Sequence, residues 1–123
     1  MDFEFDEDKP IYKQLVEKLK LQIILGFFKP GDKLPSVREL SSIIRVNPNT
    51  IQRSLSELED VGLIFTKRTS GKFVTENQKI IHQIKKELAI EKTDKFINDM
   101  NELGLNKNEV IKLLEGRKNI LWV

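Results

Sequence analysis

The sequence predicts a mainly α-helical fold that carries one small β-hairpin. Three observations lead to this prediction. Apolar residues recur at intervals of three and four over most of the chain, which is the period of an amphipathic helix. Helix start signals stand at residues 36–39 and 47–48. Two β-branched and aromatic runs, residues 63–67 and 72–75, flank a glycine-containing turn, which is a hairpin signal.

Size and composition limit the classes of protein that this chain can belong to. At 123 residues we expect one domain, or one domain with an appendage. The chain has no cysteine, which fits a reducing cytoplasm. No apolar run approaches the roughly 20 residues that span a bilayer, and the N-terminus is acidic, unlike a signal peptide. We therefore expect a soluble, cytoplasmic protein with no membrane partner.

The pattern divides the chain into an acidic lead-in (1–9), a compact domain (10–75) and a helical tail (76–123). The lead-in carries Phe3 and Phe5 among acids, so we predict a frayed or strand-like segment; the alternative is that it joins a sheet edge or a partner subunit. An amphipathic helix follows, ending near Gly26 and burying the back of a later helix; its apolar residues are Ile11, Leu15, Leu19 and Ile23.

Residues 29–32 predict a turn, and residues 33–34 are expected to pair briefly with the hairpin. Ser36 as the N-cap and Glu39 three residues later form a capping box, which begins a short second helix with one apolar face. That face is formed by Val37, Leu40 and Ile44.

A third helix is predicted to begin at Pro48, with Asn47 as its cap, and to close at Gly62. The link at residues 45–47 is short, so the second and third helices form a helix-turn-helix. Ile51, Leu55 and Leu58 form the apolar face of the third helix. Its other face carries side chains that can read base edges in a major groove: Asn49, Thr50, Gln52, Arg53 and Ser56.

The charge distribution agrees with this interpretation. The net charge of the chain is only +2. Residues 1–10 hold five acids and one lysine (−4), whereas residues 29–75 hold eight bases and five acids (+3). The basic residues thus concentrate where DNA would bind.

These motifs resemble the N-terminal winged helix-turn-helix of GntR-family bacterial transcription regulators. The resemblance rests on residues 10–15, 29–40 and 46–58, in that order, and extends to about Thr75. The short remainder is similar to the YtrA-like subfamily, whose members have only a small helical dimerisation tail. The resemblance implies a repressor that binds double-stranded DNA, often at an operator of a transporter operon.

Geometry and resemblance together assign roles. Arg38, Arg45 and the amides near Ser36 are expected at phosphates, with a solvated side chain as the alternative for Arg38. Gln52 and Arg53 are expected to read adenine and guanine, although Thr50 and Arg53 could instead touch phosphates. The hairpin is expected to act as a wing, or else only to cover the core. The predicted DNA contacts are Ser36, Arg38, Arg45, Asn47, Asn49, Thr50, Gln52, Arg53, Lys67, Arg68, Thr69, Ser70, Gly71 and Lys72.

Beyond residue 75 the apolar spacing predicts a long helix that Gly104 ends, followed by a last helix that Asn106 and Glu109 cap. These helices have too little chain for a core of their own, so a second copy is expected to cover them; the alternative is packing on the first helix of the same chain. The predicted dimerisation residues are Ile80, Ile84, Leu88, Phe96, Ile97, Met100, Leu103, Val110, Leu113 and Leu114. The apolar end, residues 120–123, is expected to dock on these helices or on a partner.

No enzyme, cofactor or metal is expected. His82 is the only histidine, and a surface position is the simplest interpretation. Asp94, Asp99 and Glu102 fit a solvated face better than a metal site. The tail leaves little room for a pocket of about 300 Å³ within one subunit, so any effector would sit between subunits.

The leading hypothesis is a homodimeric repressor that binds a palindromic operator. Its rival is an architectural DNA-binding or protein-interaction module without sequence choice.

Overall fold

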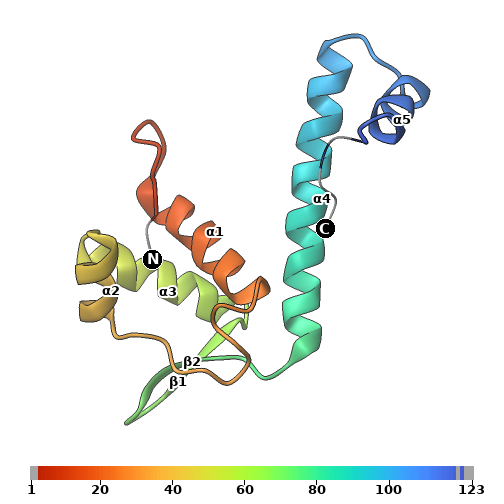
Figure 1. Cartoon of the computed structure of the whole chain (residues 1–123). Helices are drawn as coiled ribbons and strands as arrows, with labels where there is room; N and C mark the ends of the chain where they lie inside the picture. Colours follow the sequence, from red (N-terminus) through yellow and green to blue (C-terminus); the bar gives the residue numbers. More distant parts are fainter. Residues whose placement is uncertain (1–2, 119, 121–123) are drawn as a thin grey trace. The chain divides into compact units, whose positions relative to one another are not determined.

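The computed structural model describes residues 3–118 and residue 120 (Figure 1). Within these residues the chain forms five helices and a two-stranded antiparallel sheet, as predicted. The elements are α1 (Ile11–Ile24), α2 (Val37–Ile44), α3 (Pro48–Asp60), β1 (Ile64–Lys67), β2 (Gly71–Val74), α4 (Gln78–Glu102) and α5 (Lys107–Glu115). The described residues fall into two compact units, which divide within α4 between Lys85 and Lys86.

The core of the first unit forms where α1 packs on α3. α1 buries Leu15, Val16, Leu19 and Ile23, and α3 buries Ile51, Leu55 and Leu58. The hydroxyl of the fully buried Ser54 donates a hydrogen bond of 3.1 Å to the carbonyl oxygen of Tyr12, so this polar group is satisfied inside the core. The prediction that the first helix covers the back of the third is confirmed.

α2 begins at the predicted capping box. The Ser36 hydroxyl accepts from the Glu39 N–H at 3.1 Å, and the Glu39 carboxylate accepts from the Ser36 N–H at 3.1 Å. These bonds hold the pKa of Glu39 below its ordinary value, the largest cause being the bond from the Ser36 backbone. Leu40 and Ile44 are buried and Val37 is half-buried, so the predicted apolar face is confirmed.

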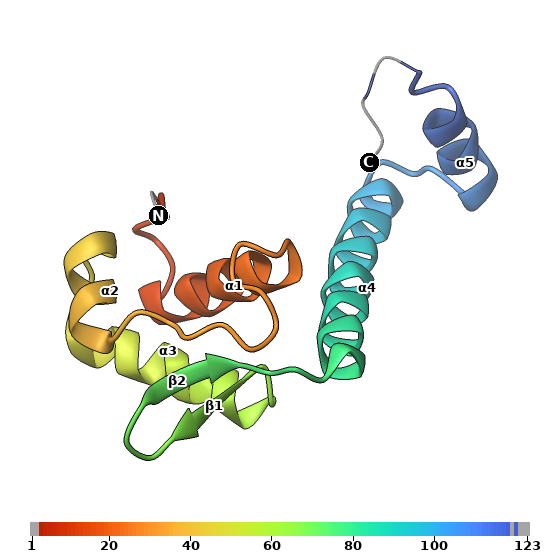
Figure 2. The ribbon, with the colours of Figure 1, turned by 60° about the horizontal axis from the view of Figure 1, so that its bottom comes forward.

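The hairpin pairs in the register Ile64 to Val74 and Lys67 to Gly71. Figure 2 shows the two strands, β1 and β2, side by side. The segment before α2 joins its outer edge, as predicted, because Leu34 N–H donates to the Lys72 carbonyl at 2.8 Å. This third segment ties the start of α2 to the hairpin.

The lead-in forms no strand in its described part, residues 3–9. The side chain of Gln14 holds it in a turn: its Oε1 accepts from the Asp6 N–H and its Nε2 donates to the Asp6 carbonyl, both at 2.7 Å. Phe3 and Phe5 meet edge to face, and the Lys18 ammonium lies within 6 Å of both ring centroids. The lead-in therefore folds onto α1, because its contacts are with Gln14 and Lys18 of that helix.

α4 begins in the first unit and ends in the second. Ile81 and Ile84 are buried in the first unit. Gly104, with a φ of +78°, follows the end of α4 and stops the helix from continuing. α5 starts with the predicted capping box between Asn106 and Glu109. Both predicted helix boundaries are confirmed.

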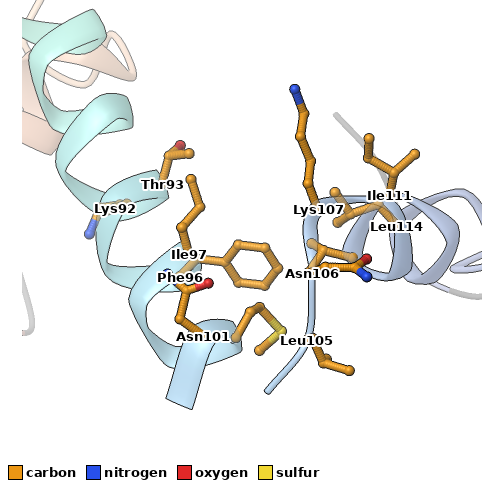
Figure 3. A pocket seen from close by; sticks show the side chains of 12 residues that line it. Lys92, Thr93, Phe96, Ile97, Asn101, Leu105, Asn106, Lys107, Ile111 and Leu114 are labelled. Atoms are coloured by element: carbon orange, nitrogen blue, oxygen red, sulfur yellow. The ribbon is translucent and has the colours of Figure 1, made fainter. Parts of the chain in front are cut away.

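The second unit contains an apolar groove of about 570 Å³ between α4 and α5 (Figure 3). Phe96 projects from α4 toward α5, and Ile111 and Leu114 of α5 also line the groove. The expectation of little room for a pocket within one subunit is therefore wrong. The reason is geometric: the turn after Gly104 sets α5 opposite α4, but the facing side chains do not fill the space.

The next feature is the apolar C-terminal end, residues 120–123, of which the structure describes Ile120. Ile120 is 51% exposed, and the other residues of the predicted docking segment, 121–123, lie outside the described residues.

Replacement of Ser36 by alanine should destabilise the fold by about 1 kcal/mol, because the N–H groups at the start of α2 lose their cap. Thermal unfolding measures this loss. Ser42→Ala is the matched control, since Ser42 is exposed on the same helix and outside the capping box. Equal melting temperatures for the two variants would contradict the role of the cap.

Candidate nucleic-acid interface

The start of α3 is fixed by a local cap. The Asn47 side chain accepts from the Asn49 N–H at 2.8 Å, and Pro48 occupies the first helical turn. Proline suits this place because its missing N–H would have no partner inside the helix. Asn47 thus caps α3, as the sequence predicts, and its expected contact with DNA stays a prediction.

α3 presents two chemically distinct faces. Ile51, Leu55 and Leu58 are at most 1% exposed. Asn49, Gln52, Arg53 and Ser56 are exposed, and Thr50 is half-buried. The Gln52 amide nitrogen lies 3.5 Å from the Ser56 hydroxyl, a long and weak hydrogen bond that a base edge can replace. The structure thus brings the predicted base-reading side chains together on one solvent-facing surface.

Arg53 has a partner that sequence reasoning missed. Its guanidinium carbon lies 3.5 Å from the centroid of the Tyr12 ring, in a cation–π contact. Tyr12 belongs to α1, so no periodicity within α3 could have indicated the pair.

The turn between α2 and α3 contains an arginine with a strained backbone conformation. Arg45 has a φ of +62°, and it is the only non-glycine residue with positive φ among those that the structure describes. Its N–H donates to the Ser41 carbonyl at 2.9 Å, which closes α2. Arg45 and Arg38 are both exposed on this helix-turn-helix.

The hairpin carries its cations on two faces. Lys67 lies over the stacked rings of Phe65 and Phe73, with its ammonium 4.6 Å from the Phe73 centroid. Lys72 instead forms an ion pair of 3.1 Å with Glu59 of α3, and both contact the Thr66 hydroxyl. Lys72 therefore ties the hairpin to α3. The sequence alone did not indicate that Glu59 is its partner. The predicted contacts that are exposed at the hairpin tip are Lys67, Arg68, Thr69, Ser70 and Gly71.

No group of three metal-ligating side chains occurs among the described residues. His82 is exposed on α4. None of the described helices is both long and apolar enough to cross a membrane.

Comparison with known families gives a match over most of the first unit. Residues 11–74 match the model of the bacterial regulatory proteins of the gntR family. This range covers α1 to β2 and therefore includes both the helix-turn-helix and the hairpin.

Two relatives from Bacillus subtilis are similar over nearly the whole chain. The HTH-type transcriptional regulator YhcF is 43% identical over 118 residues, which cover 96% of this chain and 95% of YhcF. The HTH-type transcriptional repressor YtrA is 41% identical over 112 residues, which cover 90% of this chain and 84% of YtrA.

Solved structures of transcription regulators are also similar to this chain. A GntR-family transcriptional regulator from Listeria monocytogenes superposes with a TM-score of 0.85 at 44% identity, over 90% of this chain and 97% of that one. The DNA-binding domain of AraR, solved in complex with the operator ORE1, is 27% identical with a TM-score of 0.52, over 58% of this chain and 90% of that one.

Acidification should remove the contribution of the Glu59 ion pair to stability. The hydrogen bond from the Thr66 hydroxyl, and then that from the Lys72 ammonium, hold the pKa of Glu59 below its ordinary value of 4.5. Because the pKa is lower in the folded state, the stabilisation is present above about pH 4.5 and is lost as the pH falls through the folded-state value. The side chain is 39% exposed, so we expect no more than about 1 kcal/mol.

Unfolding by denaturant at several pH values measures this effect. Glu59→Gln should lower stability at neutral pH and flatten the curve in the acid range. Glu57→Gln, on the same helix, is the matched control. Parallel curves for wild type and Glu59→Gln would refute the linkage.

Replacement of Arg45 by glycine should separate the effect of its strained backbone on stability from the effect of its charge on DNA binding. Glycine tolerates positive φ, so the variant should be as stable as wild type or up to about 1 kcal/mol more stable. It should nevertheless bind duplex DNA more weakly, with the salt dependence reduced by about one phosphate contact. Arg45→Asn, which also tolerates this conformation, should lose the same affinity. Full affinity in both variants would exclude Arg45 from the interface.

Proposed function

Because the chain belongs to the gntR family of bacterial regulatory proteins and is therefore a DNA-binding transcription regulator, we propose that it is a homodimeric repressor of a palindromic operator. The proposal rests above all on α3, whose buried face fixes it in the first unit while its polar face stays in solvent. A helix held in this way can enter a major groove and present Asn49, Gln52 and Arg53 to base edges.

The rest of the first unit supplies contacts that set the register on DNA. Arg38 and Arg45 are exposed on the helix-turn-helix, and the hairpin tip carries Lys67 and Arg68. These cations, with the amides near Ser36, suit phosphates on either side of the groove. The Ser36 N–H is already bonded to Glu39, so a phosphate would meet its hydroxyl or the next amides of α2.

The second unit supports self-association. Its apolar side chains remain open to solvent: Phe96 is 38%, Ile97 48% and Leu113 51% exposed. A second copy can cover this surface, and the two-fold axis of such a dimer would match an inverted repeat. Ile84 is buried and Ile80 is half-buried in the first unit, so both leave the predicted set. The proposed face consists of Leu88, Phe96, Ile97, Met100, Leu103, Val110, Leu113 and Leu114.

The biological role follows from the relatives and from the resemblance. YtrA is named a transcriptional repressor, and we carry that role over to this chain. Occupation of the operator in the bacterial cytoplasm would block transcription, and a transporter operon is the proposed target. A small-molecule effector would bind between subunits, because Phe96, Ile97 and Leu114 line the groove and also belong to the proposed dimer face.

Selection of binding sites from random duplex DNA tests this function directly. The purified protein should recover one inverted repeat and prefer it over random duplex by roughly 10³-fold or more. Recovery of no motif, with affinity that falls equally on all duplexes as salt rises, would contradict the proposal and favour an architectural binder.

Replacement of Phe96 by lysine should break the dimer, because a charge would enter the apolar face. Sedimentation should give the mass of a monomer, and affinity for the inverted repeat should fall at least about tenfold because each half-site is bound alone. Leu25→Lys, at a residue 68% exposed in the first unit, is the control and should stay dimeric. An unchanged mass for Phe96→Lys would show that the interface lies elsewhere.

A further inference from the structure

The contact between Tyr12 and Arg53 connects a helix outside the helix-turn-helix with the polar face of α3. The guanidinium carbon lies 3.5 Å from the ring centroid, which is the distance of two groups in van der Waals contact. Tyr12 is half-buried and Arg53 is exposed. The ring therefore forms a half-buried surface on which a solvent-facing cation rests.

The backbone of Tyr12 is held in place by the core. The carbonyl oxygen of Tyr12 accepts the hydrogen bond from Ser54, a residue 42 positions further along the chain and directly after Arg53. Ser54 is fully buried. Tyr12 thus contacts two consecutive residues of α3, and this bond fixes the backbone position from which the half-buried ring reaches Arg53.

This arrangement has a chemical consequence for recognition. A stacked guanidinium uses its face for the aromatic ring and keeps its N–H groups at its edges, where they can donate to two acceptors in one plane. The O6 and N7 atoms of guanine form such a pair of acceptors. An arginine that is already ordered loses less rotamer freedom when it binds, so its preference for the matching base is larger.

We propose that Tyr12 is a positioning residue that holds the Arg53 guanidinium for bidentate donation to a guanine, so that α1 contributes to the choice of operator sequence. This inference rests on the proposed function, in which the polar face of α3 enters the major groove. It assigns Tyr12 a role in specificity although the residue lies outside the helix-turn-helix.

The test uses the duplex recovered by selection. Arg53→Ala identifies the base pair that Arg53 reads, because preference should fall at that position alone. Tyr12→Leu, which keeps an apolar side chain without a ring, should lower the preference for guanine there about five- to tenfold and leave the other positions unchanged. Tyr12→Phe keeps the ring and should behave as wild type. In the Arg53→Ala background, Tyr12→Leu should have no further effect.

Each contrary result has a distinct meaning. A wild-type protein that selects no sequence would overturn the proposed function and this inference together. If wild type selects an operator but Tyr12→Leu retains full preference for guanine, only the inference fails. Equal weakening at every position, or an equal loss in the Arg53→Ala background, would also overturn it, because Tyr12 would then act on stability or on a phosphate contact.

A measurement on the unaltered chain keeps the inference testable if Tyr12→Leu does not fold. Tyr12 is the only tyrosine, so its ring protons can be identified by NMR. Close contacts between these protons and the Arg53 side chain should persist in the complex with the selected duplex. Their disappearance on binding would show that Arg53 leaves the ring, and would overturn the proposed positioning.

Discussion

The packing of α3 against α1 is the interaction on which the rest of this structure depends. Ile51, Leu55 and Leu58 are almost completely removed from solvent, and the helical period then leaves the opposite face of α3 outside. Removal of one such leucine side chain typically costs 2–5 kcal/mol, a large part of the stability of a small domain. The same burial that stabilises the unit therefore also orients the polar surface proposed to meet DNA.

Local signals decide where the elements begin, and a few longer contacts decide how they meet. The caps at Ser36 and Asn47 define α2 and α3 within the chain segments that carry them. The hairpin is fixed to α3 by Glu59 and Lys72 and to the segment before α2 by the backbone of Leu34. The ion pair joins the hairpin to α3, so the exposed cations of these two elements keep a fixed arrangement relative to each other.

The sequence predicted the elements because each one carries its own signal. Capping boxes, a proline in the first turn and regular apolar spacing are short-range patterns, and they located α2, α3 and α5. The missed features join distant residues: Tyr12 with Arg53, and Glu59 with Lys72. The volume of the groove between α4 and α5 was also missed, because it depends on how far two helices stand apart. The DNA contacts and the dimer face remain proposals, since they involve molecules outside the chain.

We propose that the first unit binds DNA through α3 and the hairpin tip. The most direct measurement is the change in backbone amide NMR signals when the selected duplex is added to the protein. We expect the largest changes in residues 36–56 and 67–71, and small changes in α5. Changes concentrated in residues 86–118, or no changes at all, would contradict it.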